Sequence, residues 1–177
     1  MMRLFFAMTF DDASKSKLKL IQDKLKQKGI EGRYTRKDNF HITLAFIGES
    51  TNEETQQLTK ILHTVTPSCD QIVVDHLGRF HQSGRQLAWL GIKNNPAIAE
   101  RQNALIETLE HHGFVTESRT YVPHITLARH VEKQAPLDEV LISPLTIPIY
   151  SIALMESKTI EGQLSYQVIE EVACSSS

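Results

Sequence analysis

The sequence contains few cysteines and no long apolar run. Only two cysteines occur among 177 residues, Cys69 and Cys174, and their separation matches no redox or metal-binding motif. We therefore expect neither a disulfide framework nor a cysteine metal site, and a reducing cytoplasm is the expected location. The apolar run at 4–10 is followed at once by Asp11 and Asp12. It is too short to span a membrane and lacks the pattern of a secretory signal, so we expect no membrane partner.

An excess of positive charge is also absent, because the formal net charge is −2. A protein that follows a long nucleic-acid backbone is usually basic, since contacts to phosphates dominate its affinity. If nucleic acid is the substrate, we expect a chain end or a short piece that is held locally.

Ordinary composition and moderate length indicate an α+β globular protein. Hydrophobic residues make up 41% and charged residues 23%, which suits one domain or two small lobes with a common core. Capping signals and apolar spacing predict helices at 11–28, 51–65 and 95–112, and strands at 3–10, 40–48, 71–80, 86–92, 124–129, 145–155 and 164–172. The polar segments 32–39 and 132–139 are expected to be connections.

The tetrapeptide His-Ile-Thr-Leu occurs twice, at 41–44 and 124–127, each time inside a run typical of a strand. Successive side chains of a strand point to opposite faces, so the His and Thr share one face and the Ile and Leu share the other. The apolar face can pack into a core, which leaves the His and Thr of each copy for a ligand.

A larger unit surrounds each copy of this motif. A strand, a helix and a polar segment precede it, and Leu4 stands 37 residues before His41 just as Leu87 stands 37 residues before His124. A unit repeated at a common offset predicts two similar halves related by an approximate two-fold axis.

The duplication also defines the expected domain organisation. We expect one bilobal domain over 1–177, with half-repeats at approximately 3–80 and 85–172. Motif strands near the axis would bring the two histidines together across a cleft. Because the two-fold relation is already internal, we expect a monomer.

Two histidines and two threonines around one cleft suit acid–base chemistry on a phosphoryl group. Imidazole titrates near neutral pH, so one ring can accept a proton from water while the other gives a proton to a leaving oxygen. Threonine hydroxyls can bind the phosphoryl oxygens. No carboxylate recurs beside the motifs, and His-x-Thr on a strand matches no common zinc spacing, so this arrangement requires neither metal nor cofactor.

A single histidine in such a strand is more often a half-buried structural residue than a catalytic one. Two copies on strands, at matched positions of a repeated unit, favour the functional interpretation. The other histidines are interpreted as surface or packing residues.

The motifs and their contexts resemble the 2H phosphoesterases. The resemblance rests on the paired HxTx motifs, on RLFFA at 3–7, and on the contexts NFHITLAFIGE and YVPHITLAR. It is strongest to the LigT-like branch, the RNA 2',3'-cyclic phosphodiesterases that are also described as RNA 2',5'-ligases. The family fold is bilobal, with two antiparallel sheets, helices outside and a central cleft. The family reaction opens a 2',3'-cyclic phosphate at an RNA 3' end and leaves a 2'-phosphate, and its reverse joins ends through a 2',5' linkage.

The resemblance also implies roles for individual residues. It makes His41 the proton donor and His124 the proton acceptor, although the two motifs are too similar for the sequence itself to decide. It places Thr43 and Thr126 on the phosphate oxygens and Arg129 near the phosphate. Strict alternation would point Arg129 away from His124, so a bulge or a strand end after the second motif is needed to turn it into the cleft.

Two alternatives remain open at this point. One is a cyclic phosphodiesterase of another 2H branch that acts on small nucleotides. The other is a module that binds RNA ends without catalysis, although binding alone does not require a matched acid and base. Phe40 and Tyr166 could stack on a base, but packing is the expected role, and Arg119 is a weaker substrate-binding candidate.

Overall fold

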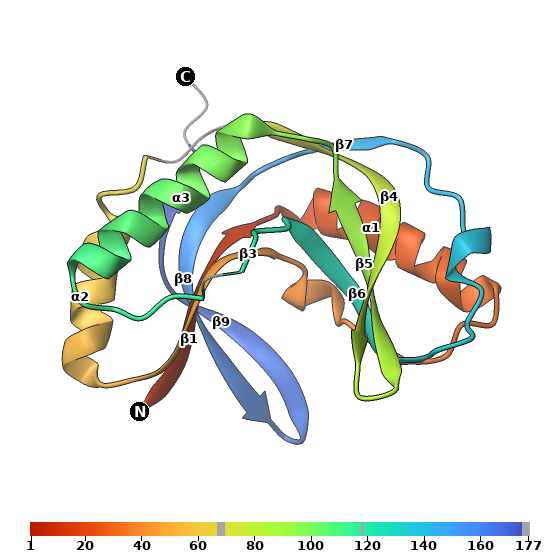
Figure 1. Cartoon of the computed structure of the whole chain (residues 1–177), viewed down its shortest axis with the longest axis horizontal. Coiled ribbons are helices and arrows are strands. Elements are labelled where there is room, and N and C mark those ends of the chain that lie inside the picture. The colour runs from red at the N-terminus through yellow and green to blue at the C-terminus, as the bar shows by residue number, and fades with distance from the viewer. Residues whose placement is uncertain (67–69, 118, 175–177) are drawn as a thin grey trace.

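The computed structural model describes residues 1–66, 70–117 and 119–174, which form two antiparallel sheets with helices outside them (Figure 1). The strand order is β3-β1-β8-β9 in the first sheet and β2-β6-β5-β4-β7 in the second. The strands are β1 (Met2–Thr9), β2 (Arg33–Tyr34), β3 (Ile42–Ser50), β4 (Gln71–Gln82), β5 (Arg85–Ile92), β6 (His124–Glu132), β7 (Leu145–Pro148), β8 (Ser151–Ile160) and β9 (Gln163–Ala173). The α-helices are α1 (Asp12–Gln27), α2 (Asn52–Leu62) and α3 (Pro96–His111), and short 3₁₀ helices occur at η1 (Lys37–Asn39) and η2 (Leu137–Glu139). The predicted α+β fold with two antiparallel sheets is confirmed.

The helices begin at capping residues that the sequence indicated. The side chain of Asp11 accepts a hydrogen bond from the Ser14 N–H at 2.8 Å, and Thr51 and Glu54 form a reciprocal capping box. Asn95 caps α3, whose first residue is Pro96. These contacts satisfy N–H groups that have no partner within the helix.

The repeated strand–helix–strand unit is present in both sheets, and the helix of each unit contacts the motif strand of the other unit. β1 pairs with β3 in the first sheet, and β5 pairs with β6 in the second. Gln22 of α1 nevertheless donates to the Leu127 carbonyl of β6, and Gln102 of α3 donates to the Leu44 carbonyl of β3. Figure 1 accordingly shows α1 beside β4, β5 and β6, with α3 on the other side of the molecule next to α2. Helix α1 follows β1 in the first unit but contacts the motif strand β6 of the second unit. Helix α3 follows β5 in the second unit but contacts the motif strand β3 of the first.

The sheets do not simply follow the two halves of the chain. β8 and β9, near the C-terminus, join β1 and β3, whereas β2 and β4 join the second sheet. The predicted strand at 145–155 is wrong as a single element, because β7 pairs with β4 in one sheet and β8 pairs with β1 in the other. Periodicity could not reveal this break, since Ile149 between them is buried in the same core that both strands cover.

Two further corrections concern short features. The predicted connection at 32–39 contains β2, which pairs with β6, and η1; the connection at 132–139 contains η2. Cys174 is disulfide-bonded, which the spacing did not indicate, because such a bond depends on which segments meet in the fold. Cys69 lies outside the described residues.

One large apolar core lies between the sheets and the helices. Among its fully buried side chains are Leu4, Ile42 and Leu58 from the first half and Leu90 and Ile125 from the second. A small second cluster, formed by Phe5, Ala7, Ala153 and Met155, lies on β1 and β8. Within the described part of the chain, no helix is both long and apolar enough to cross a membrane.

The buried amide of Gln22 provides a test of how the second motif is held. Gln22 is 2% exposed and donates to Thr35 O at 2.8 Å and to Leu127 O at 3.0 Å. Replacing it in Gln22→Met keeps the side-chain length but removes the side-chain donor of the Thr35 carbonyl and one of the two donors of the Leu127 carbonyl. We expect the free energy of unfolding to fall by about 1.5 kcal/mol. Urea denaturation measures this loss, and Gln27→Met, at an exposed position of the same helix, is the matched control. Equal stabilities of the two variants would contradict the assigned role.

Candidate active site

The two motif strands meet where the sheets adjoin, and a tyrosine ties them together. The Tyr121 hydroxyl, just before β6, donates to the backbone carbonyl of Thr43 in β3 at 2.9 Å. Burial raises the pKa of Tyr121, so the hydroxyl keeps its proton and remains a donor. This contact fixes the spacing between the strands that carry the two histidines.

Side-chain burial follows the predicted alternation in both motifs. Ile42 and Leu44 are buried, as are Ile125 and Leu127. The four His and Thr side chains are only partly buried, and all four line one cleft: His41, Thr43, His124 and Thr126. The strand period therefore placed the two His-Thr faces correctly.

A β-bulge interrupts each motif at its leucine. In the first sheet, Phe6 pairs with Ala45 and Ala7 pairs with Thr43, so Leu44 is the extra residue. In the second sheet, the pairs Ala88–Ala128 and Trp89–Thr126 make Leu127 the extra residue. A bulge shifts the alternation of the side chains that come after it. Ala45 and Ala128 are accordingly buried, directly after the buried leucines.

The bulges turn two different side chains into the cleft. Arg129 stands five residues after His124 and lines the cleft, as the bulge at Leu127 allows. Phe46 stands five residues after His41 and also lines the cleft, with the Arg3 guanidinium 5.0 Å above its ring. The duplicated site is therefore asymmetric, with a cation at one position and an exposed aromatic ring at the other.

His41 is oriented by the backbone just before it. Its Nδ1 lies 2.7 Å from the carbonyl of Asn39, and because a carbonyl only accepts, Nδ1 carries the proton and donates. Nε2 is then the titrating atom, and it lies 3.0 Å from the Thr43 hydroxyl. The rings of Phe5 and Tyr166 pack on the imidazole at centroid distances of 5.1 and 5.0 Å.

Asn39 connects this histidine to the last strand. Its buried side chain donates to Leu164 O at 2.9 Å and accepts from Tyr166 N at 3.2 Å. The same residue therefore orients His41 through its carbonyl and holds β9 in place through its amide.

His124 has an equivalent backbone contact and a different aromatic wall. Its Nδ1 donates to Val122 O at 2.7 Å, which leaves Nε2 for proton transfer. Phe80 and Trp89 pack on its ring at 5.2 and 5.6 Å. Gly78 lies directly against Trp89, where a Cβ atom would be 2.3 Å from the indole, so this position has no room for a side chain.

Both imidazoles resist protonation in the cleft without substrate. Burial lowers the pKa of His41 to about 4, against the opposing effect of its bond to Asn39, and the charges of His124 and Arg129 lower it further. Burial also lowers the pKa of His124, with Arg129 adding to the effect. Both rings are therefore neutral at pH 7, and a bound anion is needed to make proton uptake favourable.

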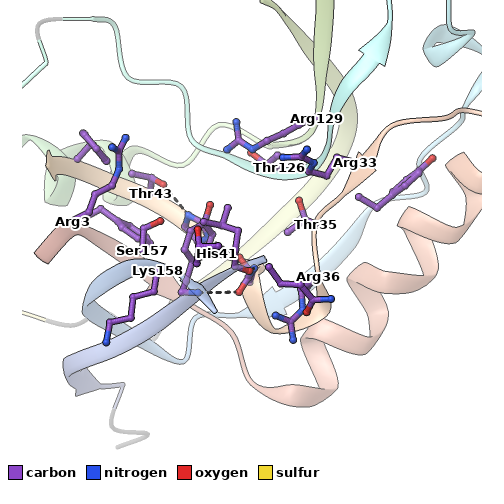
Figure 2. A pocket seen from close by; sticks show the side chains of 18 of the residues that line it. Arg3, Arg33, Thr35, Arg36, His41, Thr43, Thr126, Arg129, Ser157 and Lys158 are labelled. Carbon is purple, nitrogen blue, oxygen red and sulfur yellow. Dashed lines mark hydrogen bonds between the residues drawn. The ribbon is translucent and has the colours of Figure 1, made fainter. Parts of the chain in front are cut away.

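The cleft is large and lined by cations. Its volume is about 880 Å³, and no Asp or Glu is among its described lining residues. Arg33, Arg36 and Arg129 lie on the side of β2 and β6, and Arg3 and Lys158 lie on the side of β1 and β8 (Figure 2). The distribution favours an anionic ligand that is longer than one phosphate.

Several lining residues were not singled out from the sequence. The basic character of 32–39 was visible, but its place beside the second motif depends on the pairing of β2 with β6. Phe46, Arg3 and Lys158 had no signal in the sequence. Phe40 is 2% exposed and packs in the core as expected. Arg119 is not among the lining residues; its side chain is 85% exposed and pairs with Glu117.

Among the described residues, carboxylate, cysteine and histidine side chains do not gather into a metal-binding set. In the part of the chain that the structure describes, no group of three or more such residues could hold a metal ion. The chemistry available at the cleft is that of two imidazoles, hydroxyl groups and guanidinium groups.

Comparison with known proteins identifies relatives of this arrangement. Residues 14–159 match the family described as the 2'-5' RNA ligase superfamily. A protein from Methanocaldococcus jannaschii named RNA 2',3'-cyclic phosphodiesterase is 33% identical over 129 residues, which cover 72% of this chain and 71% of the relative. One of the same name from Thermotoga maritima is 28% identical over 179 residues, covering 96% and 94%.

Solved structures share the fold at lower identity. E. coli LigT complexed with 3'-AMP superposes with a TM-score of 0.78 at 24% identity and covers 99% of both chains. A Thermus thermophilus structure superposes with a TM-score of 0.74 at 24% identity and covers 97% of both. The family match over most of the chain, together with two HxTx strands facing one cleft, establishes that this protein belongs to the 2'-5' RNA ligase superfamily, as its resemblance to the 2H phosphoesterases predicted.

Proposed function

We propose that this protein hydrolyses the 2',3'-cyclic phosphate at RNA 3' ends and leaves a 2'-phosphate, by metal-free acid–base catalysis between His41 and His124. The observation that carries the proposal is the convergence of both histidines and both motif threonines on one cleft, with a tautomer fixed by the same backbone contact in each. The names of the relatives at 33% and 28% identity support the same reaction. A cytoplasmic monomer acting on RNA ends stays the prediction from sequence.

In the proposed mechanism, one imidazole accepts a proton and the other donates one. Nε2 of His124 removes a proton from a water that attacks the phosphorus, and the bond from phosphorus to O3' breaks. Nε2–H of His41 protonates the departing O3', which leaves the phosphate on the 2' oxygen. A 5'-hydroxyl in the position of the water would give a 2',5' linkage by the same proton transfers, which is the ligation direction.

The threonines and Arg129 stabilise the charge on phosphorus. The Thr43 hydroxyl donates to neutral His41 in the empty cleft and is free to turn to a phosphoryl oxygen once that ring is protonated. Thr126 and Arg129 lie on the opposite strand, so the non-bridging oxygens have donors from both sides. The guanidinium supplies a permanent positive charge, and none of the described lining residues offers the carboxylate oxygens that usually hold Mg²⁺.

The assignment of acid and base rests on the family resemblance. In the empty cleft His41 has a pKa near 4, and so it takes up a proton only when an anion is bound. A group held with a low pKa gives that proton up readily as the phosphate charge moves to the leaving oxygen. His41 is therefore expected to take up a proton when the anionic substrate binds and to donate that proton to the leaving oxygen during the reaction.

Removing either histidine tests the two-histidine mechanism. We expect His41→Ala and His124→Ala each to lower kcat/KM at least about 100-fold on an RNA with a 2',3'-cyclic phosphate, because each loses a proton-transfer group. His81→Ala, at an exposed position of β4, is the control. Product analysis by mass spectrometry and phosphatase mapping should find a 2'-phosphate. Near wild-type turnover by either variant, a 3'-phosphate product, or loss of activity in EDTA would contradict the proposal.

A sulfur substitution in the substrate separates acid from base. In a cyclic phosphorothiolate with sulfur in place of O3', the thiolate leaves without protonation. We expect this substrate to restore much of the activity of His41→Ala and little of that of His124→Ala, because only the acid becomes dispensable. The ratio of kcat/KM for the sulfur and oxygen substrates measures the rescue in each variant. Selective rescue of His124→Ala would reverse the assignment.

The low pKa of His41 also predicts a pH dependence of stability. The unfolded chain takes up a proton on this histidine near pH 6.5, whereas the folded protein does so only near pH 4. Stability should therefore decline as the pH falls through this range, with His41 contributing on the order of 2 kcal/mol after allowance for water in the cleft. Urea unfolding at pH 7 and pH 4 measures the decline. We expect His41→Gln to show a smaller decline and His81→Gln to behave as wild type; identical declines in all three proteins would refute the shift.

A further inference from the structure

We propose that Arg33 and Arg36 bind the phosphodiester on the 5' side of the terminal nucleotide, so that the cleft recognises the end of an RNA chain rather than a single cyclic nucleotide. The proposal rests on the function proposed above. It concerns the upstream phosphodiester, for which the two HxTx motifs provide no binding residue. Both arginines line the same cleft as His41 and His124.

The pairing of β2 with β6 places two arginines directly opposite one another. Arg33 is the cross-strand partner of Arg129, and Tyr34 is the partner of Ala128. Directly opposed side chains lie on one face of a sheet at short range, and like charges in that position destabilise the pair. An anion between or beside the two guanidinium groups removes the repulsion. The register thus favours a bound phosphate where sheet stability alone would disfavour two cations.

Among the residues that the structure describes, the three arginines have no counter-ion of their own. In the described ranges, Arg33, Arg36 and Arg129 form no ion pair, whereas neighbouring cations are paired: Lys37 with Asp12 at 3.1 Å and Lys158 with Glu156 at 3.4 Å. Among the described residues, three arginines without an ion pair therefore lie on the β2 side, whereas on the β1 side only Arg3 lacks one, and its guanidinium lies over the Phe46 ring. In a protein of net charge −2, this local surplus points to a specific anion rather than to a general basic surface.

The segment that carries the arginines is rigidly held although its side chains reach solvent. The Thr35 N–H donates to Leu127 O at 2.9 Å, and Gln22 donates to both Thr35 O and Leu127 O. The Tyr34 hydroxyl donates to Ile30 O at 2.5 Å, and the Lys26 ammonium lies 4.8 Å from the centre of the Tyr34 ring. Because the backbone is fixed before binding, little order has to be gained when an anion arrives.

The chemistry of an RNA end fits this arrangement. The cyclic phosphate occupies the space between the two His-Thr faces, with Arg129 beside it. The next anion along the chain is the phosphodiester one nucleotide upstream, and guanidinium groups bind such oxygens in a bidentate manner. Figure 2 shows Arg33 next to Arg129, with Thr35 and then Arg36 farther along the same side of the cleft. A cleft of about 880 Å³ is at the upper end of the range for small-molecule sites, roughly 300–1,000 Å³.

The experiment compares substrates that differ only in the upstream charge. The three substrates are uridine 2',3'-cyclic phosphate, the dinucleotide UpU with a 2',3'-cyclic phosphate, and the same dinucleotide with an uncharged methylphosphonate linkage. For wild-type protein we expect kcat/KM to be about tenfold higher for the charged dinucleotide than for the methylphosphonate, because one charged contact is lost. In the double variant Arg33→Gln, Arg36→Gln, this ratio should fall to near one.

The ratio of kcat/KM for the charged and the methylphosphonate dinucleotide also serves to judge the control variant and the outcomes that would refute the proposal. Arg85→Gln removes an arginine from the far end of β5, outside the cleft, where Arg85 pairs with Glu132, and it should keep the wild-type ratio. A double variant that keeps the full preference for the charged linkage would refute the subsite. An equal loss on all three substrates would place Arg33 and Arg36 at the cyclic phosphate or in folding, and would also refute it. Absence of turnover of every substrate by wild-type protein would instead refute the proposed function.

Discussion

Two buried bulges, one at the leucine of each motif, determine how this site is built. The extra residues are Leu44 and Leu127, and the carbonyl of each accepts a hydrogen bond from a glutamine side chain: Gln102 of α3 for the first and Gln22 of α1 for the second. A bulge disrupts the strand ladder locally, so a side-chain donor that satisfies its carbonyl stabilises the bulged form. Each glutamine comes from the helix of the other repeat unit. Each unit therefore stabilises the motif strand of the other.

The side chains beyond the two bulges differ between the units, and this difference gives the cleft a direction. Arg129 and Phe46 occupy equivalent positions, five residues after His124 and His41, and both line the cleft. The second unit also receives β2, which adds Arg33 and Arg36 to the side of Arg129. The first unit has instead an aromatic ring beneath the Arg3 guanidinium. Two similarly placed histidines are thus combined with cations that lie mostly on one side, an asymmetry that suits the RNA end proposed as the substrate.

The sequence predicted the two histidines as site residues, but it could not predict the backbone carbonyls to which their Nδ1 atoms donate. Strand alternation placed each histidine on the same face as the threonine of its own motif, and the matched spacing from Leu4 to His41 and from Leu87 to His124 gave a reason for the two faces to meet. The same alternation pointed Arg129 away from the cleft, because a bulge leaves no mark in a period of two. The predicted strand at 145–155 failed for a related reason: its apolar alternation continues while the chain passes from one sheet to the other.

Local sequence was enough to specify most of the elements, the repeated unit and the candidate acid–base pair, because these depend on residue period, capping residues and a motif that occurs twice. The neighbours of that pair, in contrast, were settled by the tertiary fold alone. The arginines at 33 and 36 join the cleft through the pairing of β2 with β6, and Tyr121 joins the motifs through the Thr43 carbonyl. The low pKa of His41 arises mainly from burial and is lowered further by the charges of His124 and Arg129, which are far from it in sequence. Such effects depend on distances in space, and these are set by packing across the whole chain rather than by neighbouring residues.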